Sequence, residues 1–466
     1  MQSDIRTICA PVHKPGGAIT IIRVSGPDAI SICEKIFRAK RQGKIGGRKG
    51  FSLVFGEIVS GTAVIDEVLL SLFRSPLSYT GEDMVEIACH GSAYIQNTIL
   101  QLLIENGSSP ARAGEFTQRA FLNGKVDLSQ AEAVADLIAS ESEAAHRIAM
   151  NQLKGGFSKE ILLLRSELLD LVSLLELELD FGEEDVEFAD RKQLLGIAGK
   201  ILDYAGRLSA SFALGNALKS GIPVAIAGRP NVGKSTLLNG LLNEERAIVS
   251  EIPGTTRDAI EDTFTIEGVL FRFIDTAGIR QTDDIVENLG IKKTREKISK
   301  ATVVIFMTEA TISASMIIEE IGNFREQILP ANVTLIVVVN KTDMVSESTL
   351  NELKESVKEV PGVRVLFMSA AATSGYSLLK SELTEITGVR SLDENMVVIT
   401  NARHYEALLK ITESIERVVN GIESNTPSDL IALDTRQAIH YLGEISGEIS
   451  TDEILGNIFK NFCIGK

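Results

Sequence analysis

The residues best suited to chemistry lie in one run, residues 228–235, which reads Gly-Arg-Pro-Asn-Val-Gly-Lys-Ser. It fits G-x-x-x-x-G-K-[ST], in which glycines let backbone N–H groups turn toward phosphate oxygens. Lys234 then reaches the β- and γ-phosphates, and the Ser235 hydroxyl ligates Mg²⁺. The apolar run 224–227 before the loop predicts a buried strand, and residues 237–242 predict a helix whose N-terminus favours anions. The stretch therefore predicts a nucleotide phosphate site.

Two further motifs supply groups for the phosphates and the metal ion. Residues 253–258 read Pro-Gly-Thr-Thr-Arg-Asp, and Thr256 suits Mg²⁺ coordination when a γ-phosphate is present. The apolar run 270–274 leads into Asp-Thr-Ala-Gly, where Asp275 suits the outer Mg²⁺ shell and the Gly278 N–H suits the γ-phosphate.

The base-recognition groups follow later in the chain. The apolar run 334–339 ends in Asn-Lys-Thr-Asp at residues 340–343. Guanine offers two neighbouring N–H donors where adenine does not, so the carboxylate of Asp343 accepts both and selects GTP over ATP. A last strand ends in Ser369-Ala370-Ala371, a segment placed to touch the base oxygen through its backbone. Together the five motifs resemble the G domain of translation-factor-type GTPases. They predict a doubly wound sheet with the nucleotide at its carboxyl edge.

Two departures from common GTPase patterns bear on catalysis. Ile279 follows the Asp-x-x-Gly motif, where many GTPases have a glutamine that orients the attacking water. Isoleucine has no hydrogen-bonding group, so another residue must do this work. Glu287 is a candidate, and the alternative is an ordinary solvated glutamate. The run Met307-Thr308-Glu309 also differs from the aspartate that often ends this strand, although no proposed ligand depends on it.

Composition limits the classes of protein that this chain can be. Its 466 residues predict about three domains. A net charge of −16 argues against a large nucleic-acid-coating surface. The four cysteines form no C-x-x-C pair, which argues against structural zinc and a disulfide framework. No apolar run reaches membrane-spanning length and the first residues lack a secretory layout, so we expect a cytoplasmic protein without membrane association.

The segments flanking the nucleotide motifs differ from each other in pattern. Residues 1–123 alternate apolar runs (17–24, 67–73 and 84–90) with turns, which predicts strands of a mixed α/β domain. Residues 38–49 carry six basic and no acidic residues, which favours a solvated loop over an RNA contact. From Leu128 the periods are helical: Ala131, Val134, Ala135 and Ile138 fall on one face, and 161–179 is leucine-rich. A second helical block starts near Asn401, so we expect the nucleotide segment to be inserted into a helical domain.

The whole chain resembles the bacterial TrmE (MnmE) family of tRNA-modification GTPases. The segments that carry the resemblance are 17–26, 78–86, 112–127, the insert motifs and the terminal Phe-Cys-Ile-Gly-Lys. The resemblance implies an N-terminal mixed α/β folate-binding and dimerisation domain (1–123), a discontinuous helical domain (124–220 and 385–466) and an inserted Ras-like P-loop G domain (221–384). It also implies a GTP-hydrolysing homodimer in a heterotetramer with the FAD-dependent MnmG. That complex adds a carboxymethylaminomethyl group to the wobble uridine of certain tRNAs.

The same resemblance implies residue roles. It places 5-formyltetrahydrofolate, or a related tetrahydrofolate, against Arg23, Glu86, Lys125 and Lys466. A pterin edge offers paired N–H donors to a carboxylate, and an anionic tail suits Arg and Lys. It also places K⁺ beside the phosphates, where the ion supplies charge and orders a loop for G-domain dimerisation, and it makes Glu287 the catalytic glutamate. The implied K⁺ ligands are Asn231, Ser250, Ile252 and Thr255.

The motifs and the resemblance together predict one set of GTP contacts: Asn231, Val232, Gly233, Lys234, Ser235, Thr236, Ser250, Glu251, Ile252, Pro253, Gly254, Thr255, Thr256, Asp275, Thr276, Ala277, Gly278, Asn340, Lys341, Asp343, Ser369, Ala370 and Ala371. Cys463 lies four residues from the end, but a terminal lysine fits a prenylation box poorly. It is either a free thiol near the folate or inert. The competing function is a regulatory, RNA-binding GTPase of the ribosome-assembly kind, which would have no use for the folate residues.

Overall fold

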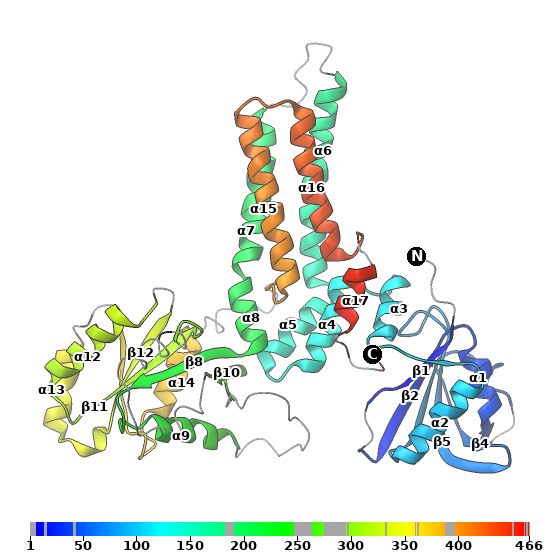
Figure 1. Cartoon of the computed structure of the whole chain (residues 1–466), viewed down its shortest axis with the longest axis horizontal. Helices are drawn as coiled ribbons and strands as arrows, with labels where there is room; N and C mark the ends of the chain where they lie inside the picture. Colours follow the sequence, from blue (N-terminus) through cyan, green and yellow to red (C-terminus); the bar gives the residue numbers. More distant parts are fainter. Residues whose placement is uncertain are drawn as a thin grey trace. The chain divides into compact units, whose positions relative to one another are not determined.

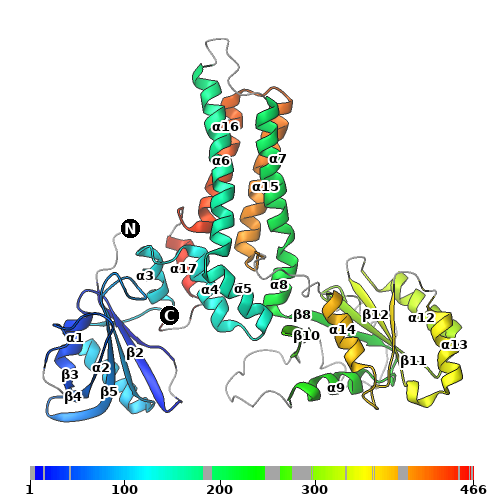
Figure 2. The same cartoon turned by 180° about the vertical axis from the view of Figure 1, so that it is seen from behind.

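A computed structural model describes residues 6–13, 16–40, 43–181, 191–246, 263–274, 295, 298–330, 333–358, 360, 363–386, 397–449, 452–460, 462 and 465. The chain forms two compact units. One comprises residues 1–139, 149–209 and 403–466, and the other comprises 140–148 and 210–402. Figures 1 and 2 show the elements of each unit from opposite sides.

The first unit contains a seven-stranded sheet in the order β3-β4-β5-β6-β2-β1-β7. Its strands are β1 (Ile8–Pro11), β2 (Ile19–Ser25), β3 (Phe37–Ala39), β4 (Ser52–Ser60), β5 (Ala63–Phe73), β6 (Met84–His90) and β7 (Ser109–Pro110). The three runs predicted as strands are therefore confirmed. Helices α1 (Ala29–Ile36) and α2 (Ala93–Glu105) pack with the apolar side chains of one sheet face, including Leu70 and Ile87, which are fully buried.

The opposite face of this sheet is exposed on β4 and β5 among the described residues. Leu53 and Phe55 alternate along β4 and are 64% and 52% exposed, and Leu69, paired with Phe55 on β5, is 41% exposed. Because successive side chains of a strand point to opposite faces, these three side chains share the face opposite to the helices. The sheet thus presents an apolar strip on β4 and β5 that stays exposed among the described residues.

The helical part of the first unit is a bundle of four long helices, visible as the shaft in Figure 1. They are α6 (Gly156–Phe181), α7 (Arg191–Ala210), α15 (Ala402–Glu423) and α16 (Ser428–Ser446). Buried side chains recur at alternating steps of four and three residues: Leu164, Leu168, Leu171 and Leu175 on α6; Leu194, Ala198, Ile201 and Ala205 on α7; Leu408, Ile411, Ile415 and Val418 on α15. This spacing is typical of helices packed nearly parallel along one seam.

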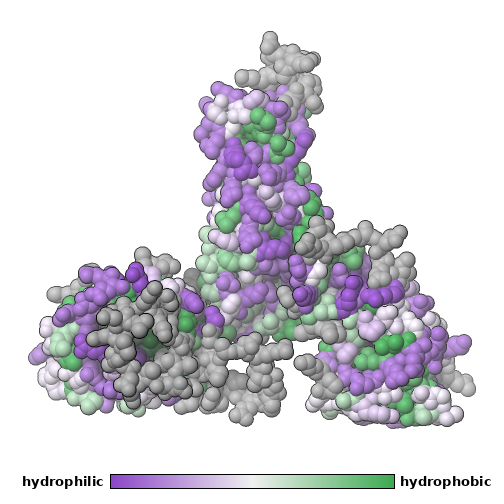
Figure 3. All heavy atoms as spheres, in the orientation of Figure 1, coloured by the Kyte–Doolittle hydropathy of each residue, from purple (hydrophilic) through white to green (hydrophobic). Residues whose placement is uncertain are grey.

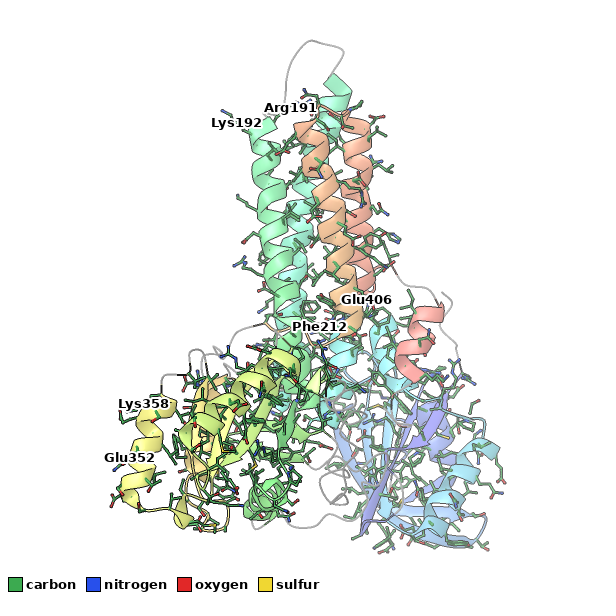
Figure 4. The ribbon with its side chains drawn as sticks, turned by 60° about the vertical axis from the view of Figure 1, so that its left-hand side comes forward. Arg191, Lys192, Phe212, Glu352, Lys358 and Glu406 are labelled. Carbon is green, nitrogen blue, oxygen red and sulfur yellow. The ribbon has the colours of Figure 1, made fainter. Side chains whose placement is uncertain are left out.

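A polar contact joins two helices at one end of the four-helix bundle. Arg191, labelled in Figure 4, donates a hydrogen bond to the carbonyl of Ile422 at 2.6 Å and so ties the start of α7 to the end of α15. The visible outer surface of the shaft is mostly hydrophilic (Figure 3). Among the described residues, no helix is long and apolar enough to cross a membrane.

Shorter helices complete this part of the structure: α3 (Glu115–Leu122), α4 (Leu128–Ala139) and α17 (Asp452–Lys460). Helix α5 (Glu143–Leu153) is divided between the two units after Ile148. The helix predicted from Leu128 is confirmed, but the prediction that Ile138 shares a packed face with Ala131 is wrong. Ala131 is fully buried, whereas Ile138 is 49% exposed. The buried side chains of α4 lie between Leu128 and Ala133, so the packing of this helix uses its first turns and leaves Ile138 outside.

The second unit is built on a six-stranded sheet in the order β13-β12-β11-β8-β10-β9. Its strands are β8 (Ile222–Gly228), β9 (Thr263–Ile266), β10 (Val269–Phe273), β11 (Val303–Glu309), β12 (Thr334–Asn340) and β13 (Arg364–Phe367). All neighbouring pairs are parallel except β9 with β10. The remaining elements are α8 (Phe212–Ser220), α9 (Lys234–Arg246), α12 (Ala314–Gln327), η2 (Thr342–Met344), α13 (Glu347–Val357) and α14 (Tyr376–Ile386).

Helices cover both faces of this sheet. Leu237 of α9 and Leu379 of α14 pack with Val224 and Ile305 on one face. Ile317 of α12 and Leu353 of α13 pack in the cluster on the other face. The exposed side of α13 carries Glu352, and the exposed Lys358 directly follows the helix (Figure 4). The strand order and two-sided cover confirm the predicted doubly wound fold, which brings the carboxyl ends of β8, β11, β12 and β13 to one edge.

Candidate functional site

The phosphate loop connects β8 to α9, as the sequence predicts. Gly233 has a φ of 103°, and a Cβ at this position would lie 2.3 Å from Nδ2 of Asn340, so only glycine fits. Lys234 Nζ donates hydrogen bonds to the carbonyl oxygens of Gly228 and Arg229 at 2.8 and 2.6 Å. Burial lowers the pKa of Lys234, because desolvation penalises the ammonium form. A bound phosphate would offset that penalty, so the loop is suited to an anion.

The other described residues of this loop vary in exposure. Ser235 and Thr236 form the first turn of α9 and are exposed, whereas Val232 is buried. Asn231 is exposed and has a φ of 62°, a left-handed conformation that asparagine tolerates better than most residues. The hydroxyl and amide groups predicted to meet metal ions are therefore at the surface of the loop.

Asn340 joins the phosphate loop to the base-recognition loops. Its Nδ2 donates to the Val232 carbonyl at 2.7 Å, and its Oδ1 accepts from the Ala370 N–H at 2.8 Å. The side chain is only 3% exposed, so both bonds form away from bulk water. Tyr376 adds a hydroxyl bond to the Ala370 carbonyl at 3.2 Å. One buried amide thus connects three segments that the sequence places far apart.

Asp343 and the 369–371 segment lie at the carboxyl ends of adjacent strands. Asp343 is exposed in η2, directly after β12, and Thr342 N–H donates to the Met368 carbonyl at 3.2 Å. Ser369 and Ala370 are buried, whereas Ala371 is exposed. Within the described part of the chain no hydrogen bond engages the Asp343 carboxylate. The structure therefore brings together the predicted base-binding residues and leaves that carboxylate accessible.

Several predicted site residues lie outside the described residues, and their roles stay predictions. They are Ser250, Glu251, Ile252, Pro253, Gly254, Thr255, Thr256, Asp275, Thr276, Ala277, Gly278, Glu287 and Lys466. Ile279 and Cys463 also lie outside. The strand that leads to Asp275 is described: β10 ends at Phe273, parallel to β8.

A second candidate site lies on the N-terminal sheet, where β2 and β6 pair in antiparallel register with Arg23 opposite Glu86. Arg23 Nη2 lies 2.8 Å from Glu86 Oε1, and its Nε donates to the same oxygen at 2.9 Å. The two side chains are 12% and 22% exposed. Both contacts fall on Oε1, and in the described chain Oε2 of Glu86 is left without a partner.

Aromatic rings and the chain terminus surround Arg23. Its guanidinium carbon lies 5.1 Å from the ring centroid of Tyr79 and 5.5 Å from that of Phe116, within cation–π range. Its Nη1 donates to the Gly465 carbonyl at 3.1 Å, which places the last described residue beside the predicted site. Lys125, by contrast, donates to the Pro76 carbonyl at 3.0 Å and contacts neither Arg23 nor Glu86 among the described residues.

Sequence reasoning missed the two aromatic residues at this site. Tyr79 and Phe116 stand inside segments that carry the family resemblance, but no pattern in the sequence indicates that either ring meets Arg23. Tyr79 also bonds through its hydroxyl to Thr117 Oγ1 at 2.8 Å, and burial raises the pKa of this tyrosine. The sequence offers only one indication that these rings belong to a site: both lie in runs rich in polar residues.

The basic run 38–49 is partly neutralised by acidic residues of the neighbouring strands. Arg38 Nη2 lies 2.5 Å from Glu57 Oε2, and Lys40 Nζ lies 2.9 Å from Glu67 Oε1. Hydrogen bonds from Lys40 and Arg38 lower the pKa of Glu57. Arg38 and Ala39 belong to β3, so the loop interpretation is wrong for the start of this run, while the paired surface charges agree with a solvated segment.

Comparison with known proteins covers nearly the whole chain. The model for the GTP-binding protein TrmE N-terminus matches residues 7–125, and the model for the MnmE helical domain matches residues 128–463. Proteins called tRNA modification GTPase MnmE are similar throughout. The one from Christiangramia forsetii is 53% identical over 474 residues, and the one from Flavobacterium psychrophilum is 52% identical over 467, each comparison covering 99% of both chains. The one from Bacteroides thetaiotaomicron is 51% identical over 465 residues, again covering 99% of both.

The doubly wound sheet, the phosphate loop and the Asn-Lys-Thr-Asp loop define a P-loop protein of the GTPase class. The chain belongs to the MnmE family of tRNA modification GTPases. The predicted family, the predicted fold class and the prediction of a GTP hydrolase are thereby confirmed.

Proposed function

We propose that this GTP hydrolase is the GTP-hydrolysing component of a complex that adds a carboxymethylaminomethyl group to the wobble uridine of certain tRNAs. The observation that carries the proposal is the Arg23–Glu86 pair beside Gly465, in a chain that also has a complete phosphate loop. A ribosome-assembly GTPase would need the loop but not the pair. Because tRNA is the proposed substrate, we also propose that the protein acts in the cytoplasm.

The residues at the Arg23–Glu86 pair fit a reduced folate. The free Oε2 of Glu86 can accept N–H donors from a pterin edge, while Arg23 holds Oε1. The Tyr79 and Phe116 rings supply apolar surface next to the pair. Bound 5-formyltetrahydrofolate would supply a one-carbon unit. The chain's own residues would bind and orient it through Glu86 and Arg23, with the predicted Lys125 and Lys466 available for its anionic tail.

Calorimetry with 5-formyltetrahydrofolate tests this site. We expect the wild-type protein to bind, and Glu86→Gln to bind at least about tenfold more weakly, because a charged hydrogen-bond acceptor is lost. The matched control is Glu67→Gln, an exposed glutamate on β5 of the same sheet. Deleting residues 465–466 should also weaken folate binding while leaving GTP turnover near normal. Equal affinity in Glu86→Gln and the control would contradict the folate proposal, and equal affinity in the truncated protein would remove Lys466 from the site.

The phosphate loop provides the described part of the proposed metal sites. Ser235 and Thr256 would hold Mg²⁺, and Asn231 with oxygens of Ser250, Ile252 and Thr255 would hold K⁺. The exposed hydroxyl of Ser235 and the exposed amide of Asn231 are oxygen donors, as both ions require. Mg²⁺ would neutralise phosphate charge, and K⁺ would supply further positive charge beside the phosphates. Lys234 would exchange its carbonyl partners for phosphate oxygens.

Hydrolysis also needs a positioned water. Since Ile279 has no hydrogen-bonding group, we propose that Glu287 orients the water once K⁺ has ordered the 250–255 segment and two G domains have paired.

We also propose that the chain is divided into three domains: the N-terminal domain 1–123, the helical domain 124–220 with 385–466, and the G domain 221–384.

The exposed apolar strip on β4 and β5 of the N-terminal sheet supports a homodimer. Leu53, Phe55 and Leu69 expose apolar surface on adjacent strands, which a second copy would cover. We propose that this dimer assembles with the FAD-dependent protein MnmG into a heterotetramer that acts on tRNA. Size measurement of the purified protein, with and without Leu53→Asp plus Phe55→Asp, tests the dimer. A dimer that survives both charges would contradict the assignment of this face.

A further inference from the structure

Two acidic side chains near the carboxyl end of β11 contact the two nucleotide loops without being predicted to touch nucleotide. The strand ends in Thr308 and Glu309, which pair in register with Val339 and Asn340 of β12. On its other side, β11 pairs with β8, with Met307 opposite Gly228. The end of β11 therefore lies between the strand that leads into the phosphate loop and the strand that leads into the base loop.

The contact with the base loop runs through Lys341. The Lys341 ammonium forms an ion pair with Glu309, and both side chains are partly exposed, at 29% and 27%. Lys341 has a φ of 61°, a left-handed conformation that is uncommon for a residue with a long side chain. The hydrogen bond from Lys341 lowers the pKa of Glu309, so this carboxylate is ionised at neutral pH. Glu309 thus fixes the side chain of the residue two positions before Asp343.

The contact with the phosphate loop runs through Arg229. Arg229 Nε lies 2.7 Å from Glu320 Oε1 of α12, and Thr308 Oγ1 donates to Glu320 Oε2 at 2.8 Å. Glu320 is 10% exposed and Thr308 is fully buried, so the Thr308 hydroxyl holds the Glu320 carboxylate in place. The contact of that carboxylate with Arg229 is an ion pair without hydrogen-bond geometry. Arg229 stands two residues before Asn231 in the loop. The charge of Arg229 also contributes to the lowered pKa of Glu309, after the larger effect of Lys341.

We propose that Glu309 and Glu320 are positioning residues of the GTP site, with Glu309 acting through Lys341 on the base loop and Glu320 acting through Arg229 on the phosphate loop. A loop held in its binding conformation before the ligand arrives loses less conformational entropy on binding. A glutamate side chain is one methylene longer than aspartate, which lengthens the reach of Glu309 toward Lys341. The glutamate at the end of β11, where the common G-domain pattern has aspartate, would thus position Lys341. The proposal rests on the proposed guanine and K⁺ contacts.

The two residues should have separable effects. Glu309→Gln should raise the Kd for GDP and the KM for GTP by about two- to fivefold with kcat nearly unchanged, because a partly exposed ion pair is weak and the lost interaction serves ground state and transition state alike. Glu320→Gln should raise the K⁺ concentration needed for half-maximal turnover and leave the preference for GDP over ADP intact. The matched control is Glu319→Gln, an exposed neighbour on α12 with the same chemical change.

The test is a double-mutant cycle read by fluorescent methylanthraniloyl-GDP binding in KCl with Mg²⁺. If Glu309 acts through Lys341, then Lys341→Met and the double variant Glu309→Gln/Lys341→Met should bind GDP equally, since the second change removes nothing further. Additive losses, or no change in Kd in Glu309→Gln, would overturn the role of Glu309. An unchanged K⁺ requirement in Glu320→Gln would overturn the role of Glu320. Failure of the wild-type protein to prefer GDP to ADP would instead refute the guanine assignment itself.

Discussion

At the scale of single residues, Asp343 presents an accessible carboxylate at the end of β12. We expect Asp343→Asn to weaken GTP binding at least about tenfold, because a charged hydrogen bond contributes about 1.5 to 3 kcal/mol. The amide can donate where the carboxylate only accepts, so the variant should gain affinity for xanthine nucleotides. Parallel titrations of both proteins with GTP, ATP and xanthosine triphosphate check this. Unchanged GTP affinity would rule out Asp343 as the base-reading group.

Gly233 provides a second prediction at the same scale. In Gly233→Ala the new methyl group would meet Nδ2 of Asn340, and the backbone would also be held at an unfavourable φ. Such strain costs on the order of 1–3 kcal/mol. We expect Asn340 to lose its bond to the Val232 carbonyl, and both nucleotide affinity and thermal stability to fall. Gly322→Ala is the control, because a Cβ there meets nothing within 4 Å. Wild-type GDP affinity in Gly233→Ala would show that the loop adapts.

At the scale of elements, a buried charge cluster joins α4 to the start of α15. Arg403 Nη2 lies 2.9 Å from Glu132 Oε2, and His404 Nε2 lies 2.8 Å from the same oxygen. The ring of Phe157 stacks on His404 at 4.9 Å between centroids. Burial alone would raise the pKa of Glu132, but the charges and hydrogen bonds of His404 and Arg403 outweigh it and hold the pKa at about 2.

This cluster makes the stability of the first unit dependent on pH. A carboxyl whose pKa is lower in the folded state stabilises the fold above its unfolded pKa, and the effect is lost as the pH falls through the folded value. For Glu132 the window runs from about 4.5 down to about 2, and the contribution at neutral pH is on the order of 3 kcal/mol. Glu132→Gln should therefore be much less stable than wild type at pH 7, with the difference shrinking toward pH 3.

Urea unfolding at the two pH values, followed by helical circular dichroism, measures that difference. Glu176→Gln is the matched control, because Glu176 pairs with Arg436 between α6 and α16 at an exposed position. Such pairs contribute little, so the control should resemble wild type at both pH values. If the difference between Glu132→Gln and wild type is the same at pH 3 and pH 7, the ionised state of Glu132 is not what stabilises the bundle.

At the scale of the whole molecule, the proposed K⁺ site couples ion binding to G-domain pairing and turnover. GTP turnover should be much faster in KCl than in NaCl, because the smaller Na⁺ fits the same oxygens poorly. Asn231→Ala should lose the K⁺ dependence. Glu287→Ala should keep nucleotide binding and K⁺-dependent pairing but lose turnover by roughly 10² or more, the range for a positioned catalytic group.

Turnover and G-domain association measured in matched KCl and NaCl separate these steps. Equal rates in the two salts would refute the K⁺ mechanism. Full activity in Glu287→Ala would show that Glu287 is an ordinary solvated glutamate without a catalytic role.

The sequence alone determined the G domain and the place of its motifs, because the relevant groups sit in short runs directly after apolar strands. Parallel strands bring their carboxyl ends to one edge, so the order of motifs is enough to predict that 228–235, 340–343 and 369–371 meet there. Helical periodicity likewise predicted α4 and α6. Periodicity could not show which turns of a helix would be packed. The exposure of Ile138 at the end of α4 was therefore not predictable from the sequence.

Only the tertiary structure decided which distant residues became partners. Arg23 meets Glu86 because β2 and β6 pair in one particular register, and a shift by one residue would place the two side chains on opposite faces. Glu132 meets Arg403 and His404 across 271 and 272 residues of chain, and Asn340 meets Val232 across 108. A sequence pattern shows which face of an element is buried. Which element covers that face depends on how the whole chain packs.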